Sequence, residues 1–139
     1  MERWPAVKGV CLNLQPKANN LVLGRTTHCL AGVPSIEEQF CSIKLSLSST
    51  TFVQVNTPQA ERIVQLLTKW LLVQCSGARV VDAYCGVGTI ALPLAKAGFD
   101  VQGLELNSDS VEQARLNACL LYTSPSPRDL STSRMPSSA

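Results

Sequence analysis

A short glycine-containing stretch between two apolar runs holds the residues best suited to chemistry. The first apolar run ends in Asp82, Gly86 and Gly88 follow it, and Glu105 ends the second run. Glycines let the backbone approach a ligand closely, and a helix that begins after such a turn offers unpaired N–H donors. A carboxylate at the end of the second run can accept hydrogen bonds from two ribose hydroxyls. This pattern predicts a binding site for a nucleoside-bearing cofactor.

Two classes of cofactor fit this stretch. The letters GVGTIA satisfy GxGxxA, the fingerprint of nicotinamide dinucleotides. Asp82, however, would repel a pyrophosphate and suits the cationic methionine end of S-adenosylmethionine. Tyr84 and Cys85 are bulky where a diphosphate would pack. These features favour S-adenosylmethionine, and the alternative is a fragment of an NAD-dependent oxidoreductase.

The elements that must position these residues follow from the hydrophobic pattern. Short β-branched runs predict buried strands at 78–84 and 100–106. The glycine loop leads into a helix at 89–98, where Pro93 implies a distortion or a place near the helix start. Asn107 and Ser108 cap a helix that runs to about residue 118, with Val111 and Ala114 facing inward. Strand, loop, helix, strand and helix in this order begin a doubly wound α/β sheet.

The first half of the chain has two kinds of pattern. Residues 7–14 and 43–47 alternate as short strands, so the first 56 residues form a β-rich unit. Thr57 and Pro58 then signal a helix start, with Thr57 as the N-cap. The helix extends to about residue 73. Its apolar face is predicted to consist of Ile63, Leu66, Leu67, Trp70 and Leu71.

Composition limits the function classes. The chain has 139 residues, of which 45% are hydrophobic and 16% charged, as in ordinary soluble domains. A net charge of +2 does not by itself indicate a polyanion partner. The sequence shows neither a secretory signal nor a membrane-length apolar run, so we expect a cytoplasmic protein. The six cysteines form no CxxC pair and His28 is the single histidine, so free thiols and no metal site are expected.

Three segments resemble the RNA uracil-5-methyltransferase family, which makes 5-methyluridine in ribosomal and transfer RNA. They are TTFVQVNTPQA, VVDAYCGVGTIALPLA and VQGLELN, and the likeness extends over residues 7–118. LGRTTHCLAG looks more like the ribosomal-RNA branch of the family. The resemblance implies an α/β protein in which an N-terminal β-rich segment precedes the first β-α-β-α units of an incomplete, Rossmann-like class I methyltransferase sheet. It also implies S-adenosyl-L-methionine as cofactor and RNA as substrate, with no membrane partner.

The resemblance assigns cofactor contacts residue by residue. For three of these residues a simpler interpretation is open: a solvated side chain for Gln54, a core aromatic for Tyr84 and a surface charge for Glu105. The implied cofactor contacts are Gln54, Tyr84, Gly86, Gly88, Thr89 and Glu105.

No catalytic residue is expected within the chain. Enzymes of this family add a thiolate to carbon 6 of uracil, so that carbon 5 can accept the methyl group. Cys85 lies in the cofactor loop, whereas the family's nucleophile and base lie on later segments. We therefore expect the parent protein to be an RNA methyltransferase and this chain to be inactive. A non-catalytic RNA-binding module built on the N-terminal strands is a further alternative.

The last residues differ abruptly in composition. Residues 123–139 are rich in Ser, Pro, Thr and Arg and have few apolar side chains. CLLYTSPSPRD and SRMPSSA resemble, in order, the translated halves of a transposon-type sequencing adapter. We expect residues 1–56 to be the β-rich segment, 57–118 a partial methyltransferase domain, and 119–139 a non-native, disordered tail.

Overall fold

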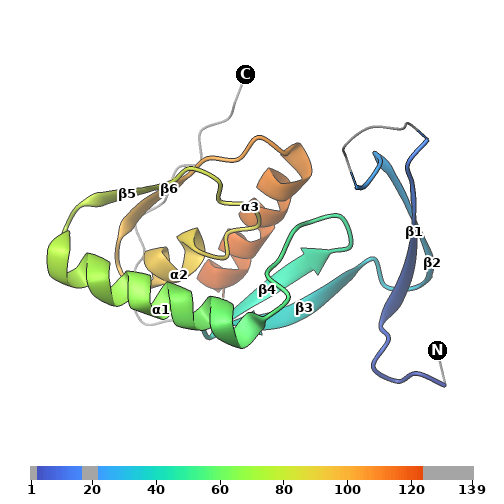
Figure 1. The fold of residues 1–139 in the computed structure, drawn as a ribbon, viewed down its shortest axis with the longest axis horizontal. Helices are drawn as coiled ribbons and strands as arrows, with labels where there is room; N and C mark the ends of the chain where they lie inside the picture. Colours follow the sequence, from blue (N-terminus) through green and yellow to red (C-terminus); the bar gives the residue numbers. More distant parts are fainter. Residues whose placement is uncertain (1–2, 17–21, 124–139) are drawn as a thin grey trace.

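The computed structural model describes residues 3–16 and 22–123, and their helices and strands are arranged as Figure 1 shows. The first four strands form two antiparallel pairs, and the last two form a parallel pair. In chain order the elements are β1 (Gly9–Leu14), β2 (Thr26–Gly32), β3 (Ser35–Phe40), β4 (Ile43–Ser48), α1 (Thr57–Gln74), β5 (Arg79–Asp82), α2 (Ala91–Lys96), β6 (Asp100–Gly103) and α3 (Ser108–Thr123).

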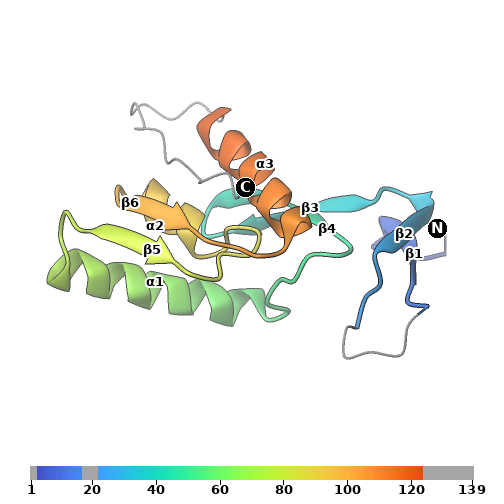
Figure 2. The same cartoon turned by 90° about the horizontal axis from the view of Figure 1, so that it is seen from above.

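Two hairpins make up the N-terminal part. Strands β1 and β2 pair with each other at one end of the molecule, and β3 and β4 pack against the helices (Figures 1 and 2). Ile43, Leu45 and Leu47 are buried on one face of β4, whereas Lys44 is exposed. The alternation predicted for 43–47 is confirmed, because burying one face of a strand requires this period of two.

The turn between β3 and β4 is held by both neighbouring helices. Cys41 and Ser42 have positive φ values of 48° and 59°, a conformation more often adopted by glycine or asparagine. The Cys41 N–H donates to Glu61 Oε1 of α1 at 2.5 Å. Lys96 Nζ of α2 donates to the Ser42 carbonyl at 2.7 Å. The contacts from Glu61 and Lys96 therefore fix the turn, and the sequence of the turn itself does not predict them.

The parallel pair β5–β6 has α1 and α2 on the same side, below the strands in Figure 1. Val80 pairs with Val101 across the two strands, and both pack into the apolar cluster beneath them. The opposite face leaves Val81 53% exposed. Pro93 is the third residue of α2, where a missing N–H costs no hydrogen bond within the helix. The predicted strand–helix–strand order is confirmed.

Helix α1 buries only part of the predicted face: Leu67 and Leu71 pack into the core as predicted, whereas the other three predicted residues do not. Ala60, Val64 and Leu71 are buried, whereas Ile63, Leu66 and Trp70 are 64%, 60% and 57% exposed. The apolar band of the helix is wider than the stripe that contacts the core, so periodicity alone does not identify its inner edge.

The N-cap of α1 also differs from the prediction. The cap is Asn56, whose Oδ1 accepts from the Gln59 N–H at 3.3 Å, and Thr57 is already within the helix. Asparagine and threonine are both good N-caps, and asparagine is the more strongly preferred of the two.

Helix α3 continues to Thr123, five residues beyond the predicted boundary at 118. The prediction of a disordered tail is wrong for residues 119–123. Leu121 packs on the same apolar cluster as Ala118, because the sequence Ala-Cys-Leu-Leu-Tyr extends the apolar spacing of the helix. The rest of the predicted tail, 124–139, lies outside the described residues.

The core has two adjoining clusters. The first joins the β3–β4 hairpin to the N-terminal half of α1 and to Val87 of the glycine loop. The second joins Leu71 of α1 to Leu94 of α2 and Val101 of β6. Both clusters therefore pack against the glycine loop. No helix within the described residues is long and apolar enough to cross a membrane.

Candidate functional site

Glu105 links the ends of the two parallel strands. Its Oε2 accepts a hydrogen bond from the Gly86 N–H at 3.0 Å, and its Oε1 accepts from the Asn107 N–H at 2.8 Å. Parallel strands bring their carboxyl ends to the same edge of a sheet, so residues far apart in sequence meet there. The structure thus brings together two of the predicted site residues, and Glu105 is partly buried rather than a free surface charge.

The loop after β5 turns on its two glycines. Gly86 has a φ of 54° and Gly88 a φ of 95°. The Gly88 N–H donates to the Cys85 carbonyl at 2.8 Å, and the Gly88 carbonyl accepts from the Leu92 N–H at 3.0 Å, which leads the chain into α2. A Cβ at Gly86 would meet open space, so the backbone is accessible from outside at this position. A bulky group can approach the main chain closely there.

Asp82, at the end of β5, faces the same loop. Burial raises the pKa of this carboxyl, and the negative charge of Glu105 raises it further, although the N–H groups of Tyr84 and Ala91 oppose both effects. Its Oδ2 is buried and has no hydrogen-bond partner among the described residues. A buried acceptor without a partner favours a bound donor or cation at this position.

The Cys85 side chain packs in the core. Its side chain is 3% exposed and belongs to the second core cluster. Burial, with the nearby charges of Asp82 and Glu105, raises its pKa to about 11. The thiol is therefore protonated at neutral pH, which is unsuited to a nucleophile.

The other predicted residues differ in exposure and in the element that carries them. Tyr84 is 91% exposed, so the interpretation as a core aromatic is wrong. Thr89 is partly buried between Gly88 and α2, and Gln54 is exposed in the segment that joins β4 to α1. Within residues 3–16 and 22–123, no hydrogen bond joins the side chain of Gln54 or Tyr84 to the other predicted residues.

Asn117 is the residue that sequence reasoning missed. Its side chain is 0% exposed. Its Nδ2 donates to the Val87 carbonyl of the glycine loop at 3.0 Å, and its Oδ1 accepts from the Ser46 N–H of β4 at 2.7 Å. The available signal was a polar residue three positions after Ala114, on the inward face of the helix.

No family profile matches the chain. It is 58% identical over 118 residues to an uncharacterized RNA methyltransferase of Parasynechococcus marenigrum (strain WH8102), which covers 85% of this chain and 25% of that protein. It is 44% identical over 118 residues to one of Thermosynechococcus vestitus, covering 85% of this chain and 26% of that protein. The chain is a homologue of these RNA methyltransferases. It spans about a quarter of the length of these curated relatives.

Solved structures show the same fold. A tRNA (uracil-54, C5)-methyltransferase of Pyrococcus abyssi, in complex with S-adenosyl-L-homocysteine, matches with a TM-score of 0.67 and 24% identity, over 86% of this chain and 29% of that one. A SAM-dependent methyltransferase of Agrobacterium tumefaciens matches with a TM-score of 0.61 and 15% identity, over 88% and 38%. The chain therefore contains part of an α/β domain with this fold.

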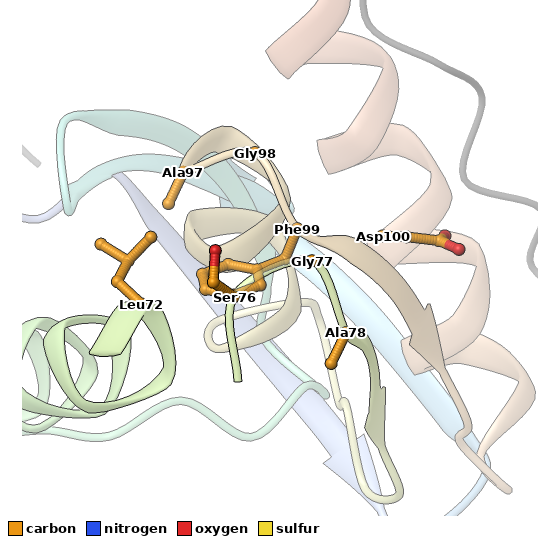
Figure 3. Close-up of a pocket in the computed structure, with 8 residues that line it drawn as sticks. All are labelled: Leu72, Ser76, Gly77, Ala78, Ala97, Gly98, Phe99 and Asp100. Carbon is orange, nitrogen blue, oxygen red and sulfur yellow. The ribbon is translucent and has the colours of Figure 1, made fainter. Parts of the chain in front are cut away.

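A hollow lies away from the glycine loop. A cavity of about 240 Å³ is bounded by the end of α1, residues 76–78 and residues 97–100 (Figure 3). These residues precede β5 and β6, so the cavity lies at the opposite end of the strands from Glu105. Asp100 points away from the other lining side chains and pairs with Arg79 at 2.8 Å. Within the described residues, no group of three or more His, Cys, Asp or Glu side chains could hold a metal ion.

Proposed function

We propose that the glycine loop and the two strand-end carboxylates bind S-adenosyl-L-methionine. The observation that carries this proposal is the Glu105 carboxylate, fixed by the Gly86 N–H at 3.0 Å beside an open approach to the backbone. A carboxylate in this place is suited to ribose hydroxyls. The buried, unpartnered Asp82 Oδ2 is suited to the positively charged methionine end. The Pyrococcus abyssi enzyme of the same fold is named as a complex with S-adenosyl-L-homocysteine, which supports this class of cofactor.

The remaining predicted contacts complete this proposed site. Tyr84 offers an exposed aromatic ring next to the loop, on which an adenine base could stack. Thr89 lies directly after Gly88, and Gln54 lies on the segment that follows β4. Bound S-adenosylmethionine would supply an electrophilic methyl group. The residues of this chain would bind and orient it.

We propose further that the parent protein methylates carbon 5 of uridine in RNA. The 58% identity to a relative named an RNA methyltransferase supports an RNA substrate, and the Pyrococcus abyssi enzyme is named for the same carbon of uracil. The family likeness of residues 23–32 favours ribosomal over transfer RNA. The buried, protonated Cys85 is unsuited to attack on uracil, so we propose that the chain alone does not transfer methyl groups.

Calorimetry with the complete 139-residue chain tests the cofactor. S-adenosylhomocysteine should bind, and NADH should not. A matched variant, E105A, removes the acceptor for the Gly86 and Asn107 N–H groups and should bind at least tenfold more weakly. Binding of NADH in place of S-adenosylhomocysteine would instead support a dinucleotide site and overturn the proposal.

A second assay tests the reaction with the full-length parent protein. Ribosomal and transfer RNA transcripts are incubated with S-adenosylmethionine, digested to nucleosides and analysed by mass spectrometry. The proposal expects 5-methyluridine in the ribosomal transcript. Methylation at another atom would contradict the proposed chemistry, and methylation of transfer RNA alone would contradict the proposed substrate.

A further inference from the structure

Asn117 connects three parts of the molecule that are distant in sequence. It projects from α3, its Nδ2 donates to the Val87 carbonyl at 3.0 Å, and its Oδ1 accepts from the Ser46 N–H at 2.7 Å. The side chain is 0% exposed. If the amide were reversed, its nitrogen would face the Ser46 N–H and its oxygen would face the Val87 carbonyl. The two backbone partners therefore fix the orientation of the amide.

The two partners of Asn117 belong to the glycine loop and to β4. Val87 stands between Gly86 and Gly88, whose φ values are 54° and 95°. Ser46 lies on β4, which leads directly into the segment that carries Gln54. One side chain therefore joins the glycine loop to the strand that precedes the segment carrying Gln54.

A loop with two glycines needs such an anchor. Glycine has access to several backbone conformations at similar energy, so the peptide units beside Gly86 and Gly88 are intrinsically soft. The Gly88 N–H is held by the Cys85 carbonyl at 2.8 Å, and the carbonyl of the same peptide unit, that of Val87, is held by Asn117. With both ends of the peptide bonded, the loop has one orientation instead of several.

We propose that Asn117 is a positioning residue for the cofactor loop. By holding the Val87 carbonyl inward, it sets the backbone of Gly86 at the position where Glu105 and the ligand meet it. This inference rests on the proposed S-adenosylmethionine site, because its effect on affinity is exerted through that loop.

The variant N117D separates the two hydrogen bonds. A carboxylate can still accept from the Ser46 N–H, but it has no donor for the Val87 carbonyl and faces it with like partial charge. At lower pH the new carboxyl gains a proton and can donate again. Gln113 provides a matched control, because it is 8% exposed on the same helix, one turn earlier, and its Nε2 has no partner among the described residues. Q113M therefore replaces a buried amide on this helix whose Nε2 holds no loop carbonyl.

Affinity for S-adenosylhomocysteine is measured by calorimetry for the complete chain at pH 7.5 and pH 5. We expect N117D to bind at least tenfold more weakly than the wild type at pH 7.5 and to recover most of this loss at pH 5, whereas Q113M binds as the wild type does. The wild type measured at both pH values corrects for any effect of pH that does not depend on residue 117. N117S removes both hydrogen bonds without adding a charge and should also lose affinity, which gives a second variant if N117D does not fold.

Amide NMR spectra without ligand test the anchoring itself. N117D should shift the Gly86 and Gly88 resonances strongly at pH 7.5, and Q113M should leave them in place. Unchanged glycine resonances, or an N117D affinity within twofold of the wild type, would overturn the positioning role. If the wild type binds no S-adenosylhomocysteine while the glycine resonances shift as expected, the cofactor proposal fails and the anchoring by Asn117 stands.

Discussion

The two glycines of the loop should respond very differently to alanine. At Gly88 the φ of 95° is strained for an L-residue, and an added Cβ would lie 2.7 Å from Cδ1 and 2.8 Å from Cγ of Leu92. At Gly86 the φ of 54° lies in the left-handed region that other residues adopt at moderate cost, and the added Cβ would meet nothing within 4 Å. G86A is therefore a matched control for G88A.

The expected loss in the free energy of unfolding follows from the backbone conformation and the surroundings of each glycine. The left-handed conformation costs an alanine about 1 kcal/mol at Gly86 and about 2 kcal/mol at the more extreme φ of Gly88. The close contact with Leu92 adds roughly 1–3 kcal/mol, because this leucine is 4% exposed in the first core cluster and has little room to move. We expect G88A to lower the free energy of unfolding by about 3–5 kcal/mol and G86A by about 1 kcal/mol.

Equilibrium unfolding of the complete chain in urea measures both changes from the transition midpoint, provided that the slope of the transition is unchanged. The two variants should also differ in what they reveal about function. G86A should remain folded yet lose affinity for S-adenosylhomocysteine, because its methyl group occupies the open approach to the loop. Equal destabilisation by the two substitutions would refute the packing argument, and undiminished binding by G86A would refute the assignment of the open side to the ligand.

Three further predictions concern single side chains. S42G should raise the free energy of unfolding by about 1 kcal/mol, because Ser42 has a φ of 59°, and a lower thermal midpoint would contradict this. D82N should raise the thermal midpoint of the ligand-free chain at pH 7 but weaken S-adenosylhomocysteine binding. Burial raises the pKa of Asp82, so the stability that its protonated form contributes is lost as pH rises through that pKa, and a midpoint unchanged by D82N would contradict this. The pKa of Cys85 is raised from 9.0 to about 11, so the stability that its protonated thiol contributes is complete below pH 9 and is lost between pH 9 and 11. In urea unfolding, the free energy of unfolding of C85A should therefore decline less steeply with alkaline pH than that of the wild type. Equal slopes of the free energy against pH would contradict this.

Local patterns were sufficient for the order of elements from α1 onward and for most of the glycine loop. The period of two at 43–47 and the β-branched runs before Asp82 and Glu105 report which neighbours a residue has along its own strand. Gly86 and Gly88 could be selected because their conformational freedom is a property of the residue type. The hydrogen bond of Gly86 to Glu105 is consistent with the parallel pairing that this order of elements requires.

Other features depended on contacts that sequence periodicity does not contain. The apolar band of α1 includes Ile63 and Trp70, yet the core selects Ala60 and Val64, because the surfaces of β3–β4 and α2 decide which edge of the band is covered. The turn at Cys41 likewise depends on Glu61, twenty residues away.

The sequence by itself determined a strand–loop–helix–strand unit with a carboxylate at each strand end, because propensity and spacing are local properties. The tertiary structure alone decided how that unit is held. Asn117 reaches Val87 across 30 positions and Ser46 across 71, and a single buried amide carries no local mark of partners so distant. Such a side chain acquires its role only when folding removes water and leaves those two backbone groups as its hydrogen-bond partners.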